Sequence, residues 1–295
     1  MDASDPSRPL DTISVGVLPT AAWAVMEFID SEGYFENHGL DVELQTSQGG
    51  AATLPAVMTG SLDIAIGNPV SVILARSKGL DVAMVTGFGS SYADGEDVVA
   101  VVAPEGSDIE TAADLEGRKV GVNTLKGHPE LTIREATDLA GGNGASIEMV
   151  EIGFPDMAGQ LEAGNLEAAF VVQPFLGTLR ANGMKVVSYP FQESAPGQMT
   201  LVSFTSGAFA EENAEVVERF KKAMAEGLDH VEKHPDGVRA ALPKLLSMPD
   251  EVAADLPLEK ASAELDEEIL GRIEKMMVKH GLLSEASGLD GAVIK

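Results

Sequence analysis

The chain has 295 residues, 44% hydrophobic and 23% charged, which suits two globular lobes of ordinary size. Its formal net charge of -27 excludes nucleic acid and anionic lipid surfaces as partners, because both would repel it. The absence of cysteine excludes disulfides, thiolate catalysis and cysteine-based metal sites, and it is compatible with an oxidising compartment. The acidity itself fits either solubility in a salt-rich habitat or docking onto a basic membrane partner.

The first ten residues are polar and rich in turn formers. They contain neither the basic nor the apolar segment of a signal peptide, and no apolar run in the chain approaches the roughly 20 residues of a membrane span. We expect residues 1–10 to form a flexible tether, with Met1 replacing a removed export or lipoprotein signal. The protein is then extracytoplasmic, in a periplasm or lipid-anchored at the outer face of a membrane; a cytosolic protein is the alternative.

Two passages of the chain alternate short apolar strands with helices in the same order. The first passage predicts a strand, helix, strand, helix and strand at residues 13–18, 20–29, 40–45, 51–59 and 60–67, closed by Asn68 and Pro69. The second passage predicts the same elements at residues 118–122, 129–140, 147–152, 157–163 and 164–172, closed by Gln173 and Pro174.

The two passages share sequence as well as order. A Val-Gly-Val triplet opens both, at residues 15–17 and 120–122, and a Gly-x-Leu-acid turn precedes both third strands. This indicates duplicated lobes. Alternating strands and helices predict parallel, doubly wound sheets, in which ligands lie beyond the carboxyl ends of the strands. Two such lobes facing each other predict one ligand-binding cleft.

The remaining segments connect and cover the lobes. Two apolar β-runs, at residues 97–103 and 199–205, are predicted to be the crossing strands of a hinge. Helical patterns at 211–233, 238–246 and 264–280 predict an all-helical C-terminal cap. We therefore assign residues 11–100 and 205–295 to the first lobe and 101–204 to the second.

Two segments carry a family resemblance that extends over residues 13–189. Residues 32–42 (EGYFENHGLDV) and 113–122 (ADLEGRKVGV) resemble the nitrate/sulfonate/taurine-type substrate-binding proteins of ABC importers, which include binders of thiamine-pyrimidine precursors. The resemblance implies an α/β, type II periplasmic-binding-protein fold. It also implies a monomer without cofactor that delivers a small solute to ABC permease subunits. Gln173 departs from the acidic residue that often stands there in the family, so ligand identity transfers less well than fold.

Candidate ligand-binding residues follow the strands that should end at the cleft. They comprise Thr20, Ala21, Trp23, Gln48, Gly49, Asn68 and Phe88 in the first lobe, and Asn123, Thr124, Phe154 and Gln173 in the second. Each also has a purely structural interpretation: Thr20 is a helix N-cap, Trp23, Phe88 and Phe154 are core side chains, and Asn68 belongs to a turn.

Two ligand classes remain open. Helix starts near Gly49 and Thr124 could hold a sulfonate, nitrate or organic acid. Alternatively, Trp23, Phe88 and Phe154 could enclose a pyrimidine-like or aromatic solute whose edge Asn68 and Gln173 recognise. We expect the organic acid or sulfonate, although the absence of arginine from the proposed cleft loops weakens a strong-anion site.

Catalytic and metal signatures are absent from the sequence. There is no G-x-S-x-G, H-E-x-x-H or P-loop, and His230 and His234 lack a third metal ligand. Enzymes of thiamine-pyrimidine synthesis share the fold implied above, but their cysteine-rich iron-binding segment cannot exist here. We therefore expect a binding protein rather than an enzyme. A cytosolic sensor would need an attached DNA-binding segment, which this sequence lacks.

Overall fold

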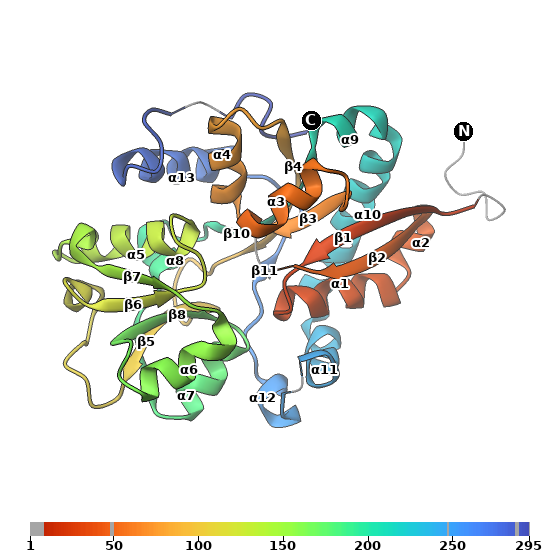
Figure 1. Ribbon diagram of the computed structural model, residues 1–295. Helices are drawn as coiled ribbons and strands as arrows, with labels where there is room; N and C mark the ends of the chain where they lie inside the picture. The colour runs from red at the N-terminus through yellow and green to blue at the C-terminus, as the bar shows by residue number, and fades with distance from the viewer. Residues whose placement is uncertain (1–8, 48–49, 247, 287–288, 295) are drawn as a thin grey trace.

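Two lobes, each built on one β-sheet, make up the molecule (Figure 1). The computed structural model describes residues 9–47, 50–246, 248–286 and 289–294. The first sheet contains, in spatial order, β11 (Lys260–Ala261), β4 (Val82–Ser90), β10 (Met199–Ser206), β3 (Ile64–Gly67), β1 (Asp11–Val17) and β2 (Leu40–Thr46). Strands β2, β1 and β3 are parallel, and β10 runs antiparallel between β3 and β4.

The second sheet repeats the arrangement of the first. Its order is β7 (Glu148–Glu151), β6 (Lys119–Val122), β8 (Ala168–Val172), β5 (Val99–Pro104) and β9 (Met184–Ser188). Here β7, β6 and β8 are parallel, and β5 runs antiparallel between β8 and β9. The predicted fold of two α/β lobes is confirmed.

Most helices of the two lobes begin just beyond the carboxyl ends of strands. In the first lobe they are α1 (Ala21–Ser31), α2 (Tyr34–Asn37), α3 (Gly50–Met58) and α4 (Pro69–Ser77). In the second they are α5 (His128–Leu139), α6 (Phe154–Glu162), α7 (Phe175–Ala181) and α8 (Pro190–Ser194), with 3-10 turns at Ala112–Leu115 and Gly144–Ser146. Proline in the first turn of α4, α5, α6 and α8 favours these starts, because a first-turn N–H has no helical partner to lose.

The C-terminal third returns to the first lobe. Its helices are α9 (Gly207–Glu212), α10 (Ala214–Lys233), α11 (Pro235–Leu246), α12 (Asp250–Ala254) and α13 (Glu267–Lys279). The expected all-helical cap is wrong in one respect, because β11 pairs antiparallel with β4 at the sheet edge. Two residues are too few to show strand periodicity. No helix among the described residues is long and apolar enough to span a membrane.

The predicted crossing strands are a second correction. Strand β5 lies wholly in the second sheet and β10 wholly in the first, so neither one spans both lobes. The chain crosses instead at residues 91–98 and 195–198, where the Ser91 N–H donates to the Gln198 carbonyl oxygen at 2.9 Å. Each apolar run therefore becomes the antiparallel strand of the lobe that the chain has just entered. The boundaries predicted at 100 and 204 fall inside these two strands.

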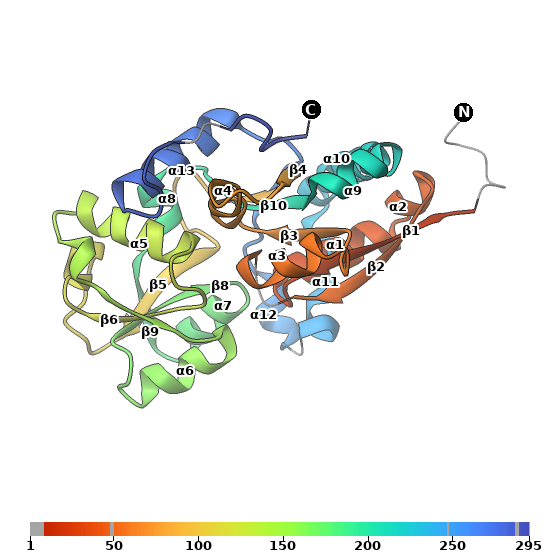
Figure 2. The ribbon, with the colours of Figure 1, turned by 45° about the horizontal axis from the view of Figure 1, so that its top comes forward.

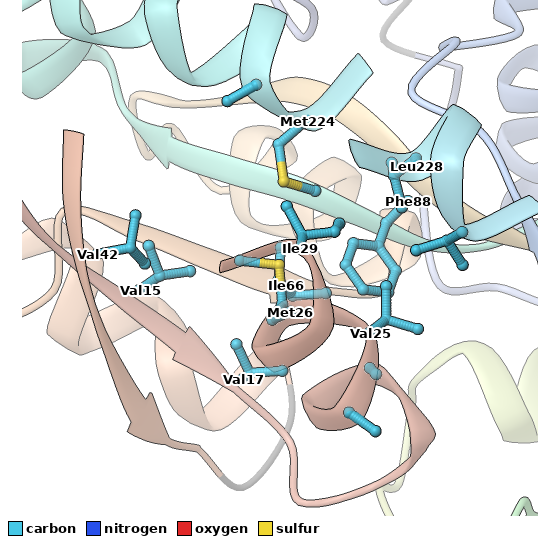
Figure 3. Packing of buried hydrophobic residues seen from close by; sticks show 14 of the residues in the cluster. Val15, Val17, Val25, Met26, Ile29, Val42, Ile66, Phe88, Met224 and Leu228 are labelled. Carbon is cyan, nitrogen blue, oxygen red and sulfur yellow. The ribbon is translucent and has the colours of Figure 1, made fainter. Parts of the chain in front are cut away.

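A continuous apolar core holds the first lobe together. Helix α1 and the long helix α10 pack on one face of its sheet, burying side chains such as Met26, Ile66 and Met224 (Figure 3). On the other face, α13 packs on α4 and reaches Leu131 of α5, so the C-terminal helix also contacts the second lobe (Figure 2). This packing orients the strand ends of both sheets toward the space between the lobes.

Candidate ligand-binding site

A cavity of about 100 Å³ lies between the lobes, with walls from both sheets. The first lobe contributes Leu18, Thr20, Ala21, Ala22, Ile66, Gly67, Asn68, Thr200, Leu201, Pro257 and Glu259. The second lobe contributes Val98, Val99, Asn123, Thr124, His128, Pro129, Phe154, Phe170, Val172, Gln173 and Phe191. An apolar cavity that accommodates benzene measures about 150 Å³, so this smaller space limits the solute to a compact one.

The structure brings most of the predicted site residues to this cavity. Its wall includes Thr20, Ala21, Asn68, Asn123, Thr124, Phe154 and Gln173. Gln48 and Gly49 lie outside the described residues. Contact between any of these side chains and a solute stays a prediction, but their convergence from five separate places in the chain follows from the two matching sheets.

Trp23 and Phe88 lie in the first-lobe core rather than on the cavity wall. The Trp23 indole N–H donates to Glu27 Oε1 at 3.2 Å, and its ring packs against that core. Phe88 is 2% exposed and lies among the side chains of α1 and α10 (Figure 3). Both were predicted as walls for an aromatic ligand. The physical reason for the difference lies in the position of each side chain. Trp23 lies one residue beyond the last wall residue of α1, and Phe88 points to the face of β4 that α1 and α10 cover.

Helix N-termini form the polar part of the first-lobe wall. Thr20 caps α1 by accepting the Ala22 N–H at 3.4 Å, and Asn68 caps α4 with Oδ1, accepting the Ser71 N–H at 2.9 Å. Because Asn68 Oδ1 accepts the capping hydrogen bond, the amide NH₂ is the part of the side chain that can donate to a solute. Both helix starts present positive dipole ends and N–H groups to this region.

Gln173 closes the third strand of the second lobe as Asn68 does in the first. Its Oε1 accepts the Gly177 N–H at 3.1 Å, in the first turn of α7, and the side chain is buried. The amide NH₂ again remains for another partner. The two lobes thus present equivalent amide groups to the cavity.

His128 is a wall residue that the sequence analysis missed. The Gln198 amide nitrogen donates to the Phe191 carbonyl and to Ser194 Oγ, so Gln198 turns its oxygen to His128 Nε2, 3.2 Å away. This arrangement places the imidazole proton on Nε2 and leaves Nδ1 as an acceptor, which has no partner among the described residues. Complete burial lowers the pKa of His128 to about 4, partly opposed by the bond to Gln198, so the ring is neutral at pH 7.

Aromatic rings line the second-lobe side of the cavity. Phe191 stacks on His128 with 4.4 Å between ring centroids, and Phe170 lies 5.6 Å from Phe191. Phe154 continues the row at 6.5 Å from Phe170. Buried Asn123 Oδ1, which has no partner among the described residues, adds a second unsatisfied acceptor to this wall. The wall therefore combines flat apolar surface with acceptors that would accept N–H or O–H groups from a solute.

An acidic side chain, Glu259, enters the cavity from the segment between α12 and β11. Burial raises its pKa to about 7; the Thr200 hydroxyl opposes this shift and Asp97 adds to it. Among the described wall residues there is no lysine or arginine. The sequence analysis did not identify Glu259, because it precedes a two-residue strand far from either repeat.

A separate polar cluster joins α5 to the C-terminal helix. Glu135, Asp138 and His280 bring ligand-type atoms within 4.8 Å of one another. Lys279 Nζ lies 2.6 Å from Glu135 and 3.4 Å from Asp138, so it already supplies the positive charge that a metal ion would bring. We interpret the cluster as an ion-pair contact between the second lobe and α13.

Comparison with known proteins decides the family. Residues 29–238 match the family model described as NMT1/THI5 like. The chain therefore belongs to this family. The resemblance to nitrate, sulfonate and thiamine-precursor binders inferred from the two sequence segments is confirmed.

Relatives of this NMT1/THI5-like protein include two curated binding proteins. The formylaminopyrimidine-binding protein of Halalkalibacterium halodurans is 28% identical over 287 residues, covering 95% of this chain and 82% of that protein. The riboflavin-binding protein RibY of Chloroflexus aurantiacus is 24% identical over 266 residues, covering 87% and 72%. Among solved structures, the alkanesulfonate-binding protein SsuA from Xanthomonas axonopodis pv. citri, bound to MOPS, superposes with a TM-score of 0.79. It is 15% identical, with 98% and 99% coverage, and shows the shared fold.

Proposed function

We propose that this NMT1/THI5-like protein is an extracytoplasmic solute-binding protein that captures one small solute between its lobes and delivers it to an ABC importer. The observation that carries the proposal is the cavity enclosed by equivalent strand ends of two similar lobes. Two short segments, 91–98 and 195–198, connect the sheets directly, which suits hinge closure around a ligand. The curated relatives named as binding proteins support this role over catalysis.

The cavity supports a compact, flat solute with N–H groups better than an inorganic or sulfonate anion. The aromatic wall offers a stacking surface. Asn123 Oδ1 and His128 Nδ1 are hydrogen-bond acceptors that have no donor among the described residues. The absence of lysine and arginine from the described wall removes the cation that a strong anion would need. The formylaminopyrimidine-binding relative adds support for the ring-shaped alternative.

Binding and closure would be coupled through contacts from both walls. Asn68 and the start of α1 belong to the first lobe, whereas Asn123, His128 and Gln173 belong to the second. A solute that bonds to both walls favours the closed arrangement over any open one by the free energy of those extra contacts. The permease would then recognise the closed, loaded protein.

A melting-shift screen of pyrimidines, sulfonates, nitrate and carboxylates tests the proposal, with mass spectrometry of each solute after incubation. We expect a ring compound bearing N–H groups to raise the melting temperature and to be recovered unchanged. Turnover of any solute would favour the enzyme alternative. If no solute shifts the melt, the cavity is not a capture site.

A pair of asparagine variants localises the binding. Asn123→Ala should weaken the best solute of the screen about tenfold, because it removes an acceptor from the wall. Asn165→Ala is the control: its side chain is exposed and bonds only to Gln160 Oε1, so affinity should not change. Equal affinities in both variants would remove Asn123 from the site.

A further inference from the structure

The carboxyl group of Glu259 is built into the cavity rather than left at its edge. Strand β11 pairs with β4 so that Ala261 opposes Gly89 and Lys260 opposes Ser90. A Cβ atom on Gly89 would lie 2.1 Å from Glu259 Oε2 and 3.0 Å from Glu259 Cβ. The whole glutamate side chain thus lies across bare backbone that only glycine provides. This packing holds the carboxyl group at the cavity wall.

Among the described residues, the charged group that acts on Glu259 is a second acid, Asp97, and no positive charge offsets it. Asp97 is 1% exposed; its Oδ1 accepts the N–H groups of Tyr92 and Val98, and its Oδ2 has no partner among the described residues. Burial raises the pKa of Asp97 to about 6, against the lowering effect of the Val98 and Tyr92 bonds. Burial disfavours the charged form of both acids. Ionising both is therefore unfavourable unless a positive charge binds nearby.

The other charged groups near this pair belong to the elements packed around it. Tyr92, whose hydroxyl donates to the Leu258 carbonyl at 2.9 Å, interacts with Glu232 and Arg239 as well as with both acids. Arg239 is engaged elsewhere: it donates to the Leu256 carbonyl and pairs with Asp236. Besides Glu259, the titratable residue on the described wall is His128, which is neutral at pH 7.

We propose that Glu259 selects the charge of the solute, so that the cavity prefers ring-sized solutes carrying a protonated amine or similar cationic N–H group and rejects anionic ones. This inference rests on the proposed function and names the solute class of the same site. An arriving cation supplies the missing counter-charge and ionises Glu259. An anion meets the same carboxyl and no lysine or arginine on the described wall.

Binding of a cation is then linked to release of a proton. Near pH 6 the Glu259 carboxyl holds its proton in the empty protein, and the solute must displace it; above pH 7 the group is already ionised. Affinity for a solute that stays cationic should rise up to about tenfold per pH unit below 7 and level off above it. Affinity for a neutral ring should not follow this pattern.

Three matched probes test the charge preference by calorimetry: benzylamine, benzyl alcohol and benzenesulfonate. We expect the wild-type protein to bind benzylamine at least about tenfold more tightly than benzenesulfonate, and we expect Glu259→Gln to lose that difference. The control is Asp255→Asn, an exposed acid four positions away, which should keep the wild-type preference.

The outcomes separate the two proposals. If benzyl alcohol binds but the charge preference is absent, or survives in Glu259→Gln, the selection by Glu259 is wrong and the capture function stands. If none of the probes binds the wild-type protein at millimolar concentration, ring capture fails, and this inference fails with it. Should Glu259→Gln not fold, the wild-type protein still decides: benzylamine must release close to one proton near pH 6 and almost none near pH 8.5.

Discussion

The two lobes solve the same packing problem with the same residues. In the first lobe, a Cβ atom on Gly16 would lie 2.6 Å from Leu62 Cδ1; in the second, a Cβ on Gly121 would lie 2.6 Å from Leu166 Cδ1. Each glycine sits in the first strand of its lobe's repeat, and each leucine lies in the turn before the third. The Val-Gly-Val and Gly-x-Leu-acid motifs are therefore two halves of one contact.

The acid of each turn completes this unit. Asp63 Oδ2 accepts the Ser14 N–H at 2.8 Å in the first lobe, and Glu167 Oε2 accepts the Lys119 N–H at 2.9 Å in the second. The lobes differ in the additional partner: Asp63 also accepts the Ser14 hydroxyl, whereas Glu167 pairs with Arg118. The hydrogen bond from the strand N–H to the turn acid therefore occurs in both lobes. In the first lobe the Ser14 hydroxyl also binds the acid, and in the second lobe the Arg118 guanidinium does.

What is not repeated carries the chemistry of the cavity. The second lobe alone supplies His128 and the phenylalanine row, and the first lobe alone supplies Glu259, through the C-terminal segment that has no counterpart in the second. Duplicated packing builds two similar walls, and the unpaired segments make those walls chemically different. Five sets of variants test this division.

The largest effect should come from filling the repeated glycine positions. Gly16→Val and Gly121→Val should each lower the free energy of unfolding by about 1–3 kcal/mol, because the added side chain overlaps the leucine opposite. Thermal and urea unfolding measure the loss. Gly106→Ala, where nothing lies within 4 Å, should stay within about 0.5 kcal/mol of the wild type.

A second change identifies the cause of that loss. Leu62→Ala added to Gly16→Val, and Leu166→Ala added to Gly121→Val, should each cost less than the two single changes together, because the overlap is removed. Additive costs in either lobe would show that the glycine and the leucine do not share one contact there.

In the wild type the free energy of unfolding should fall as pH rises, and Glu259→Gln should reduce that fall. The folded-state pKa of Glu259, about 7, lies above its ordinary value of 4.5, so between these pH values the unfolded chain releases a proton that the folded chain keeps. Stability should fall across this window by on the order of 2 kcal/mol in the wild type and less in the variant. Asp97, raised to about 6, preserves part of the fall at lower pH. A variant curve parallel to the wild type above pH 6 would contradict the burial of this acid.

His128→Gln on the opposite wall should act in the other direction. The folded-state pKa of His128 is lowered to about 4. Below about pH 6.5 this histidine is therefore protonated in the unfolded chain but stays neutral in the folded chain until the pH approaches 4. Stability should therefore fall as pH drops from 6.5 toward 4, and the variant should flatten that fall by on the order of 2 kcal/mol. Unfolding curves at pH 4.5 and 7 measure the difference; an unchanged slope would mean that His128 is not buried in the neutral form.

The smallest effect concerns the turn acids. Asp63→Ala and Glu167→Ala should each cost about 1 kcal/mol or less through the lost bond to the strand N–H. The bonds from Lys119 and Arg118 lower the pKa of Glu167, so its contribution is present above the ordinary value of 4.5 and is lost as pH falls through the folded-state pKa. High salt should reduce the cost of Glu167→Ala through the Arg118 pair and leave that of Asp63→Ala nearly unchanged. Equal salt responses would remove the distinction.

Sequence periodicity predicted the repeated strands and helices well, because each is an apolar run bounded by glycine, proline or a cap. The prediction of crossing strands at residues 97–103 and 199–205 was wrong, because the apolar pattern of a strand is the same whether it crosses between lobes or pairs within one sheet. Seven candidate residues lie on the cavity wall because they follow parallel strands, whose carboxyl ends share one sheet edge. Trp23 and Phe88 do not, since which face a side chain occupies depends on the covering helices.

The sequence by itself determined two lobes, their matching Val-Gly-Val and Gly-x-Leu-acid motifs and the loops that face one another, because these follow from local patterns that occur twice. Only the tertiary structure decided the chemistry of the cavity. His128, Phe191 and Glu259 stand on a helix start, a five-residue helix and a segment before a two-residue strand. None has a pattern of its own, and their neighbours are distant in the chain. The surroundings of these three side chains, and with them the pKa shifts of His128 and Glu259, exist only once the distant segments of the chain pack together.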